Sequence, residues 1–387
     1  MDRPLQLLDR GNLSPSHQSR LLRALARLCK LYACFPDSLI LSGVQRTRMD
    51  PSAGGGFADI WRGQLSTRCI AIKALRIFEQ SDREKALKDF SHEAIIWRQL
   101  KHPNILPFYG VFKGDENFER LCLISPWMDA GNINDYLKKY PESNRLALIA
   151  DALNGLSYLH SFQPSIIHGD LKGANIFVTH SRTACLGDFG LSRFRDSHES
   201  TLGATSGHST GTLRWQAPEL FVNVDGRTAR PSAESDVYSI GCVCLELMTG
   251  KPPFSEFSRD GAVLTAVLNK KCPQRPSEDL VHRGLNDSLW SLMKKCWHFD
   301  RDQRPKVGTL LQFFVERKWS TGPHLLRRGD LSANVSLNMT SSPVEILDVG
   351  MTGNVAGMRL VSVRMCAGVD RGVVNFSDFT AVSSPGT

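Results

Sequence analysis

The nine residues 168–176 constrain this chain more than any other part of its sequence. They place Asp170, Lys172 and Asn175 on one short segment, and Asp188 follows in the sequence Asp-Phe-Gly. An aspartate can orient a hydroxyl group and accept its proton, and a lysine can neutralise negative charge that develops during a reaction. Asparagine and aspartate supply the hard oxygen ligands that suit Mg²⁺. Any one aspartate here could be a turn residue or a helix cap, but the joint spacing indicates a loop that places charge around a reacting group.

A glycine cluster and a strand that ends in lysine precede this loop. Segment 53–60 contains three successive glycines, whose backbone amides can approach phosphate oxygens with no Cβ in the way. A cluster of this kind is more often a plain flexible loop, but it lies ahead of the segment Ile-Ala-Ile-Lys at 70–73. Glu93 lies on a predicted helix 20 residues after Lys73. This spacing predicts an ion pair between them, and a solvent-directed lysine with a solvated glutamate is the alternative.

In this order, the motifs resemble those of eukaryotic protein kinases, and more narrowly serine/threonine kinases of the tyrosine-kinase-like group. The resemblance spans about residues 40–318. It implies transfer of the ATP γ-phosphate to protein hydroxyls, with ATP and Mg²⁺ as cofactors and protein substrates as partners. The implied catalytic residues are Asp170, Lys172, Lys73 and Glu93, and the implied metal ligands are Asn175 and Asp188. The implied nucleotide site comprises Gly54, Gly55, Gly56, Phe57, Ala58, Ile60, Ala71, Lys73, Pro126, Met128, Asn175 and Asp188.

Further positions match the same family. Met128 is implied as the backbone donor to adenine, with the carbonyls of Pro126 and Met128 as acceptors, and Ser125 is implied as a small residue at the back of the pocket. Asp236 is expected to hold the backbone of the 168–176 loop. Two further sets are implied, an ion pair and a stack of side chains, and each member alone would pass for ordinary core. They are Glu219 of Ala217-Pro218-Glu219 with Arg304, and Trp97, Phe108, His168 and Phe189.

The choice of hydroxyl is also indicated by the motifs. Lys172, two residues after the implied base, and Thr212, shortly before Ala217, resemble serine/threonine kinases. Trp215 and the pair Cys296-Trp297 resemble tyrosine kinases, as is common in the tyrosine-kinase-like group. We therefore expect transfer to serine and threonine.

Three departures from the family pattern bear on activity and regulation. Ala53 and Ala58 replace glycines of G-x-G-x-x-G-x-V, which could weaken nucleotide affinity. Gly169 stands where the family has the arginine that binds a phosphorylated activation segment, so we expect that phosphorylation of this segment is not obligatory. Residues 191–216 still carry many hydroxyl groups that could accept phosphate, which a mobile polar loop would equally explain. They include Ser192, Ser197, Ser200, Thr201, Thr205, Ser206, Ser209 and Thr210.

Two other classes of protein remain as alternatives. The three departures suggest a pseudokinase that binds partners as a scaffold, although they spare the residues implied in chemistry. The net charge of +8 suggests a nucleic-acid binder, but the charges are interspersed and form no basic stripe. We expect no nucleic-acid partner, and the oligomeric state stays open.

The location of the chain is indicated by what its sequence lacks. The ten cysteines are scattered, which favours a reducing compartment. The first residues lack the apolar core of a signal peptide, and no apolar run is long enough to span a bilayer. We therefore expect a cytoplasmic protein without a transmembrane segment.

Periodicity predicts a strand-rich segment followed by a mostly helical one, and the resemblance implies an α+β, bilobal protein-kinase fold. Residues 1–45 form an extension with an amphipathic helix at 19–32, packed on its own domain or, alternatively, on a membrane or partner. The domain spans 46–318, with a small antiparallel β-rich N-lobe at about 46–127 and a larger, mostly helical C-lobe at about 128–318. Residues 319–387 are rich in Ser, Gly and Val and predict a mostly disordered tail, with a small β element as the alternative.

The expected elements have these bounds. Strands are predicted at 57–64, 68–74, 107–112 and 119–125, and a long helix at 81–100 with Ser81 or Asp82 as its N-cap. Helices of the larger lobe are predicted at 144–162, 233–250, 260–269, 287–297 and 306–317.

Overall fold

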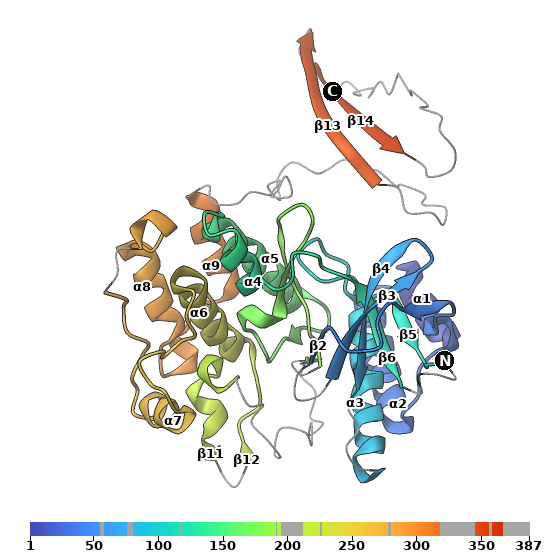
Figure 1. The fold of residues 1–387 in the computed structure, drawn as a ribbon, viewed down its shortest axis with the longest axis horizontal. Coiled ribbons are helices and arrows are strands. Elements are labelled where there is room, and N and C mark those ends of the chain that lie inside the picture. Colours follow the sequence, from blue (N-terminus) through green and yellow to red (C-terminus); the bar gives the residue numbers. More distant parts are fainter. Residues whose placement is uncertain are drawn as a thin grey trace. The chain divides into compact units, whose positions relative to one another are not determined.

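The computed structural model describes residues 1–54, 58–75, 80–115, 118, 120–190, 192–194, 212–224, 227–277, 280–317, 345–355 and 358–366. The chain divides into two units, Met1–Leu325 and Leu326–Thr387. The first unit, whose range includes all the predicted site residues, carries helices α1 to α9 (Figure 1).

An antiparallel sheet forms the strand-rich lobe. Its strands pair in the order β1-β3-β4-β6-β5, with β2 against β3. The predicted hairpin is present, because β3 and β4 pair from Leu65 with Arg68 back to Ala58 with Leu75. The strand predicted at 107–112 starts too early. Pro107 has no N–H to donate to a sheet, and β5 begins three residues beyond it, at Gly110. The strands are β1 (Val44–Arg46), β2 (Ala53–Gly54), β3 (Ala58–Leu65), β4 (Arg68–Leu75), β5 (Gly110–Phe112) and β6 (Cys122–Pro126).

One long helix, α3 (Gln80–Gln99), accompanies this sheet. The predicted N-cap is wrong, because Ser81 and Asp82 both lie inside the helix; glutamine propagates a helix well, so Gln80 is already helical. Phe90, Ala94 and Trp97 follow helical spacing and are buried on one face.

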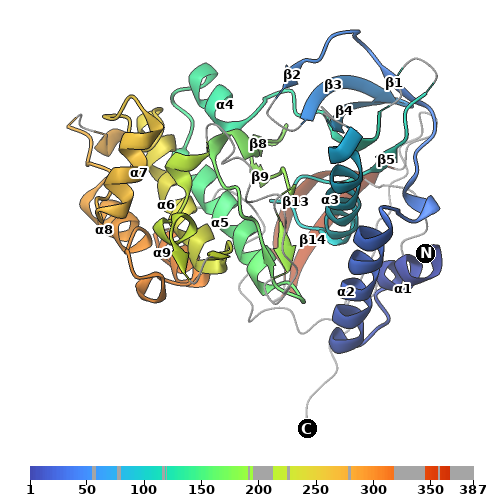
Figure 2. The same ribbon diagram turned by 90° about the horizontal axis from the view of Figure 1, so that it is seen from below.

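Two helices of the N-terminal extension lie beside α3. These are α1 (Asp2–Arg10) and α2 (Pro15–Tyr32), and α2 packs against α3, as expected for a helix packed on its own domain (Figure 2). The predicted helix starts too late, because Ser14 caps it through His17 and proline occupies the first turn. The apolar stripe is only partly buried, since Leu28 and Leu31 are 45% and 59% exposed.

The larger lobe is mostly helical, and its five predicted helices are present within two residues of the expected bounds. Ser232 and Ser235 form a reciprocal capping box at the start of α6, and Gly250 ends that helix at φ +72°. The helices are α4 (Ile133–Lys139), α5 (Arg145–Ser161), α6 (Ala233–Thr249), α7 (Asp260–Leu268), α8 (Asp287–Cys296) and α9 (Val307–Glu316).

Short elements fix the loops between these helices. Strand β8 pairs with β9, β7 with β10, and β11 with β12. Their bounds are β7 (Ile166–Ile167), β8 (Ile176–Val178), β9 (Ala184–Leu186), β10 (Arg193–Phe194), β11 (Asn223–Val224) and β12 (Arg227–Thr228). The 3-10 turns are η1 (Asp37–Leu39), η2 (Gly173–Asn175), η3 (Leu213–Trp215), η4 (Pro218–Phe221), η5 (Val281–Arg283) and η6 (Arg301–Gln303).

One continuous apolar core runs from α2 and α3 through α5 and α6 to α9. The α+β prediction of a small antiparallel lobe with one long helix, followed by a larger helical lobe, is confirmed. Across the described part of the chain, no helix is both long and apolar enough to cross a membrane.

The second unit contains an antiparallel strand pair, β13 (Glu345–Val355) with β14 (Met358–Cys366). Both strands lie in the segment 319–387, for which the sequence predicts a mostly disordered tail with a small β element as the alternative. The rest of the segment 319–387 lies outside the described residues.

Candidate active site

A lysine on strand β4 forms hydrogen-bonded ion pairs with two carboxylates. Lys73 Nζ donates to Glu93 Oε1 at 2.9 Å, so the predicted ion pair is present, and it also donates to Asp188 Oδ1 at 2.7 Å. Burial works to lower the pKa of Lys73, but the two carboxylates outweigh it and raise that pKa. Burial raises the pKa of Glu93, with Lys73 opposing it. The three groups therefore depend on one another for their charges.

The carboxylate of Asp188 is held in an unusual conformation. Its φ of +59° lies in the left-handed region, which costs an L-residue about 1–2 kcal/mol. Burial works to raise the pKa of Asp188, but the nearby Lys73 ammonium keeps it below the usual value. An anionic Asp188 and the amide oxygen of Asn175 offer hard oxygen donors of the type that Mg²⁺ takes.

The loop that follows β7 orients Asp170. Asn175 Nδ2 donates to the backbone oxygen and to Oδ2 of Asp170, both at 2.8 Å, and Lys172 Nζ lies 3.0 Å from the same Oδ2. The other carboxylate oxygen, Oδ1, is buried and has no hydrogen-bond partner among the residues that the structure describes. A buried acceptor of this kind carries a desolvation cost until a donor reaches it. Asp170 thus presents one oxygen that is already fixed and one that can accept from a hydroxyl.

Lys172 also connects this loop to the segment before Ala217. Its Nζ donates to Thr212 Oγ1 at 2.8 Å, and Thr212 is 2% exposed. Lys172 and Thr212, which together indicated serine/threonine preference in the sequence, are therefore in direct contact.

Asp236, near the start of α6, anchors the backbone of the loop as expected. The N–H groups of His168 and Gly169 donate to Oδ2 and Oδ1 of Asp236, both at 2.9 Å. His160 Nε2 lies 2.9 Å from the same carboxylate. Gly169 adopts φ +81°, so this position requires a conformation that favours glycine.

We expect Gly169→Ala to lower the free energy of unfolding by about 1–2 kcal/mol, because the left-handed conformation strains a residue that has a Cβ. Thermal or denaturant unfolding measures the change. Gly308→Ala is the matched control, since Gly308 lies in α9 with open space around its Cβ position and alanine favours a helix. Equal stabilities for Gly169→Ala and the unmodified protein would contradict the expectation.

Glu246 is a site residue that sequence analysis missed. Its carboxylate lies on α6 and accepts from Gly173 N at 2.9 Å, Trp215 Nε1 at 2.8 Å and Asn134 Nδ2 at 2.7 Å. Burial raises its pKa, and these donors oppose the increase. A glutamate within the apolar stretch from Ile240 to Met248 was the available signal, because a buried carboxylate needs partners. Glu246 joins the loop of Asp170 to the segment that contains Trp215.

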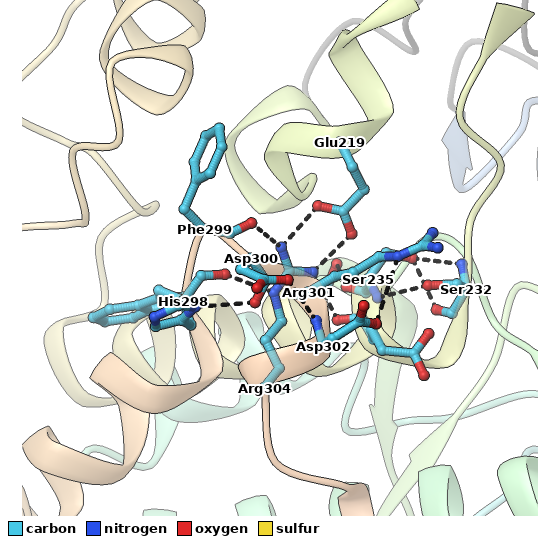
Figure 3. A network of polar contacts seen from close by, with 12 residues as sticks. Glu219, Ser232, Ser235, His298, Phe299, Asp300, Arg301, Asp302 and Arg304 are labelled. Atoms are coloured by element: carbon cyan, nitrogen blue, oxygen red, sulfur yellow. Dashed lines mark hydrogen bonds and ion pairs between the residues drawn. The ribbon is translucent and has the colours of Figure 1, made fainter. Parts of the chain in front are cut away.

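The predicted pair of Glu219 and Arg304 is present and bidentate (Figure 3). Both guanidinium-to-carboxylate distances are 2.7 Å, and the Arg304 side chain is fully buried. Arg304 Nε also donates to the carbonyl of His298 at 2.8 Å, and its guanidinium lies 5.2 Å from the centre of the Tyr238 ring. This network fixes η4, which carries Glu219, to the helical lobe.

The four residues of the predicted stack lie in contact. Ring centroids are 5.2 Å apart for Trp97 and Phe108, 5.5 Å for Trp97 and Phe189, and 5.4 Å for His168 and Phe189. The stack joins α3 to the loop of Asp170 through Phe189, which neighbours Asp188.

The implied nucleotide residues are only partly described. Ile60 pairs with Lys73, and Ala71 pairs with Ser125, which is buried. The Met128 carbonyl accepts from Gly131 N at 2.9 Å, which uses one of its two acceptor positions. Ala58 is buried and Gly54 ends β2. Gly55, Gly56 and Phe57 lie outside the described residues.

The activation segment is described only in part. Ser192 is buried and its hydroxyl donates to the His168 carbonyl at 3.2 Å, so it is a structural residue here. The other seven predicted acceptors, from Ser197 to Thr210, lie outside the described residues.

Comparisons with known proteins agree with this geometry. A family model described as protein tyrosine and serine/threonine kinase matches residues 50–314. Serine/threonine-protein kinase STY46 of Arabidopsis thaliana is 30% identical over 68% of this chain and 43% of its own length. Serine/threonine-protein kinase CTR1 of the same plant is 30% identical over 66% of this chain and 30% of its own. Dual specificity protein kinase shkA of Dictyostelium discoideum is 31% identical over 68% and 47%. The chain spans less than half the length of these relatives.

Proposed function

Because this chain belongs to the protein tyrosine and serine/threonine kinase family, we propose that it transfers the γ-phosphate of ATP to serine and threonine hydroxyls of protein substrates. The observation that carries the proposal is the placement of Asp170. One of its oxygens is fixed by Asn175 and Lys172, and the other is buried without a partner among the described residues. In the proposed reaction Asp170 orients the acceptor hydroxyl and takes its proton, while Lys172 neutralises charge on the phosphate in transfer.

Nucleotide and metal would be held at the other end of the site. Lys73, fixed by Glu93, would contact the α- and β-phosphates, and Asn175 and Asp188 would supply oxygens to Mg²⁺. When bound, the metal neutralises the charge of the β- and γ-phosphates. The remaining proposed nucleotide contacts are Gly54, Gly55, Gly56, Phe57, Ala58, Ile60, Ala71, Pro126 and Met128.

The preference for serine and threonine rests on the contact between Lys172 and Thr212 and on the names of the relatives. A relative with dual specificity makes tyrosine transfer the second candidate. The pseudokinase scaffold has no support from the site, because Lys73 lies within hydrogen-bonding distance of both Glu93 and Asp188. We further propose a cytoplasmic location and an activity that does not require phosphorylation of the activation segment.

The test is phosphate transfer from labelled ATP, with and without Mg²⁺, to matched peptides that contain one serine, one threonine or one tyrosine. We expect Mg²⁺-dependent transfer to serine and threonine. The rate of the Lys73→Met variant defines the background against which this transfer is measured. Transfer no greater than that of a folded Lys73→Met variant would favour the scaffold, and equal labelling of the tyrosine peptide would favour dual specificity. A rise of a hundredfold or more after phosphorylation of the activation segment would contradict the proposed regulation.

A further inference from the structure

The helix that carries Glu93 depends on the N-terminal extension for its packing. Among the described elements, α2 makes the most extensive contact with α3. Of the strands of the sheet, β5 makes the largest contact with α3, and that contact is much smaller than the one made by α2. Figure 2 shows α2 beside α3, with α1 packed against α2. The position of Glu93 therefore rests on α1 and α2 as well as on the lobe to which it belongs.

Apolar side chains make the middle of this contact. Leu25 and Cys29 of α2 are buried and belong to the same core cluster as Phe90 and Ala94 of α3. Phe35, just beyond α2, lies 6.3 Å from Phe90 between ring centres. Both residues of α3 are within one turn of Glu93, so this packing acts close to the ion pair.

Polar contacts fix α3 on both sides of Glu93. On the N-terminal side, Lys30 Nζ lies 3.7 Å from Asp89 Oδ1. On the C-terminal side, the carboxylate of Asp9 on α1 accepts from Arg98 at 2.8 Å and from Gln99 at 3.4 Å. Contacts at two points along a helix restrict both its rotation and its sliding.

We propose that Asp9 is a positioning residue for phosphate transfer, because α1 and α2 hold α3 where Glu93 reaches Lys73. This inference rests on the proposed kinase activity. Glu93 is 6% exposed, and a buried carboxylate separated from its cation is costly, so a small movement of α3 would displace Lys73 as well. A displacement of about 1 Å in a site of this kind can cost up to about 100-fold in rate.

The experiment reverses the charge of Asp9 in the full chain. We expect Asp9→Arg, which faces Arg98 with a like charge, to lower kcat/KM for ATP by about fivefold or more. The double variant Asp9→Arg/Arg98→Asp, which restores opposite charges, should recover most of the loss. Asp2→Asn is the control on the same helix, because Asp2 accepts from Ser38 N at 2.7 Å and not from α3; it should keep the wild-type rate.

A second measurement separates positioning from general stability. In a Glu93→Gln background, Asp9→Arg should cause little further loss, because its effect passes through Glu93. Hydrogen exchange should become faster at the amides of 90–99 in Asp9→Arg. Equal fold-losses in both backgrounds, or unchanged rate and exchange, would overturn the proposal. If Asp9→Arg does not fold, Asp9→Asn replaces it. If the wild type transfers no phosphate, the kinase proposal fails, and the exchange experiment alone still decides whether Asp9 holds α3.

Discussion

Replacing Asp170 with asparagine should lower kcat by about 10²–10⁴-fold, the usual contribution of a positioned general base. The amide keeps the size of the carboxylate and can still contact Asn175 and Lys172, but it cannot accept the proton of the substrate hydroxyl. KM for ATP should change little, because Asp170 is not among the proposed nucleotide contacts. Steady-state rates with a serine peptide measure both quantities.

The matched control for this substitution is Asp135→Asn. Asp135 lies on α4 with its side chain 59% exposed, and its only salt-bridge partner among the described residues is Lys138, at 3.4 Å. This variant should keep the wild-type kcat. A loss of less than tenfold in Asp170→Asn, with Asp135→Asn unchanged, would remove Asp170 from the role of base.

Replacing Arg304 with alanine should lower the free energy of unfolding by about 3–5 kcal/mol, because it leaves Glu219 without its bidentate partner. The substitution also removes the donor to the His298 carbonyl and the contact with Tyr238. For a domain of this size, a loss of this order lowers Tm by about 10 °C. Differential scanning calorimetry or thermal circular dichroism measures it.

Arg301→Ala provides the comparison, because Arg301 lies three residues before Arg304 (Figure 3). The Arg301 side chain is 52% exposed. Its contact with Asp302 spans 3.8 Å at the surface, so its loss should change stability by less than about 1 kcal/mol. Similar Tm changes for the two variants would show that the buried pair does not stabilise the domain as expected.

The sequence predicted those parts of the site that short motifs encode. Lys73 with Glu93 and Glu219 with Arg304 were expected as pairs, and Asp236 as the anchor of the loop, because each lies in a local pattern with a known partner. Glu246 was missed because its three donors come from segments far apart in the chain. No local sequence spacing predicts hydrogen bonds of this kind. The contacts of Asp9 with α3 were missed for the same reason.

Element bounds were predicted less well where tertiary packing decides them. The helix of Glu93 begins before Ser81. On α2, Leu28 and Leu31 belong to the predicted apolar stripe but are exposed at the surface. Periodicity assigns these leucines to the apolar face, but the partner helix covers only part of that face. The width of a contact depends on both surfaces, and one sequence segment describes only its own.

Asp236 and Glu246 give helix α6 a further consequence. They lie ten residues apart on one buried helix, about 15 Å along its axis. The first holds the start of the loop of Asp170, and the second holds Gly173 together with Trp215 of η3. The loop of Asp170 and the 3-10 turn η3 are thus both held by one buried helix, α6. We therefore expect the spacing between the loop of Asp170 and Trp215 to stay constant when the two lobes move relative to each other.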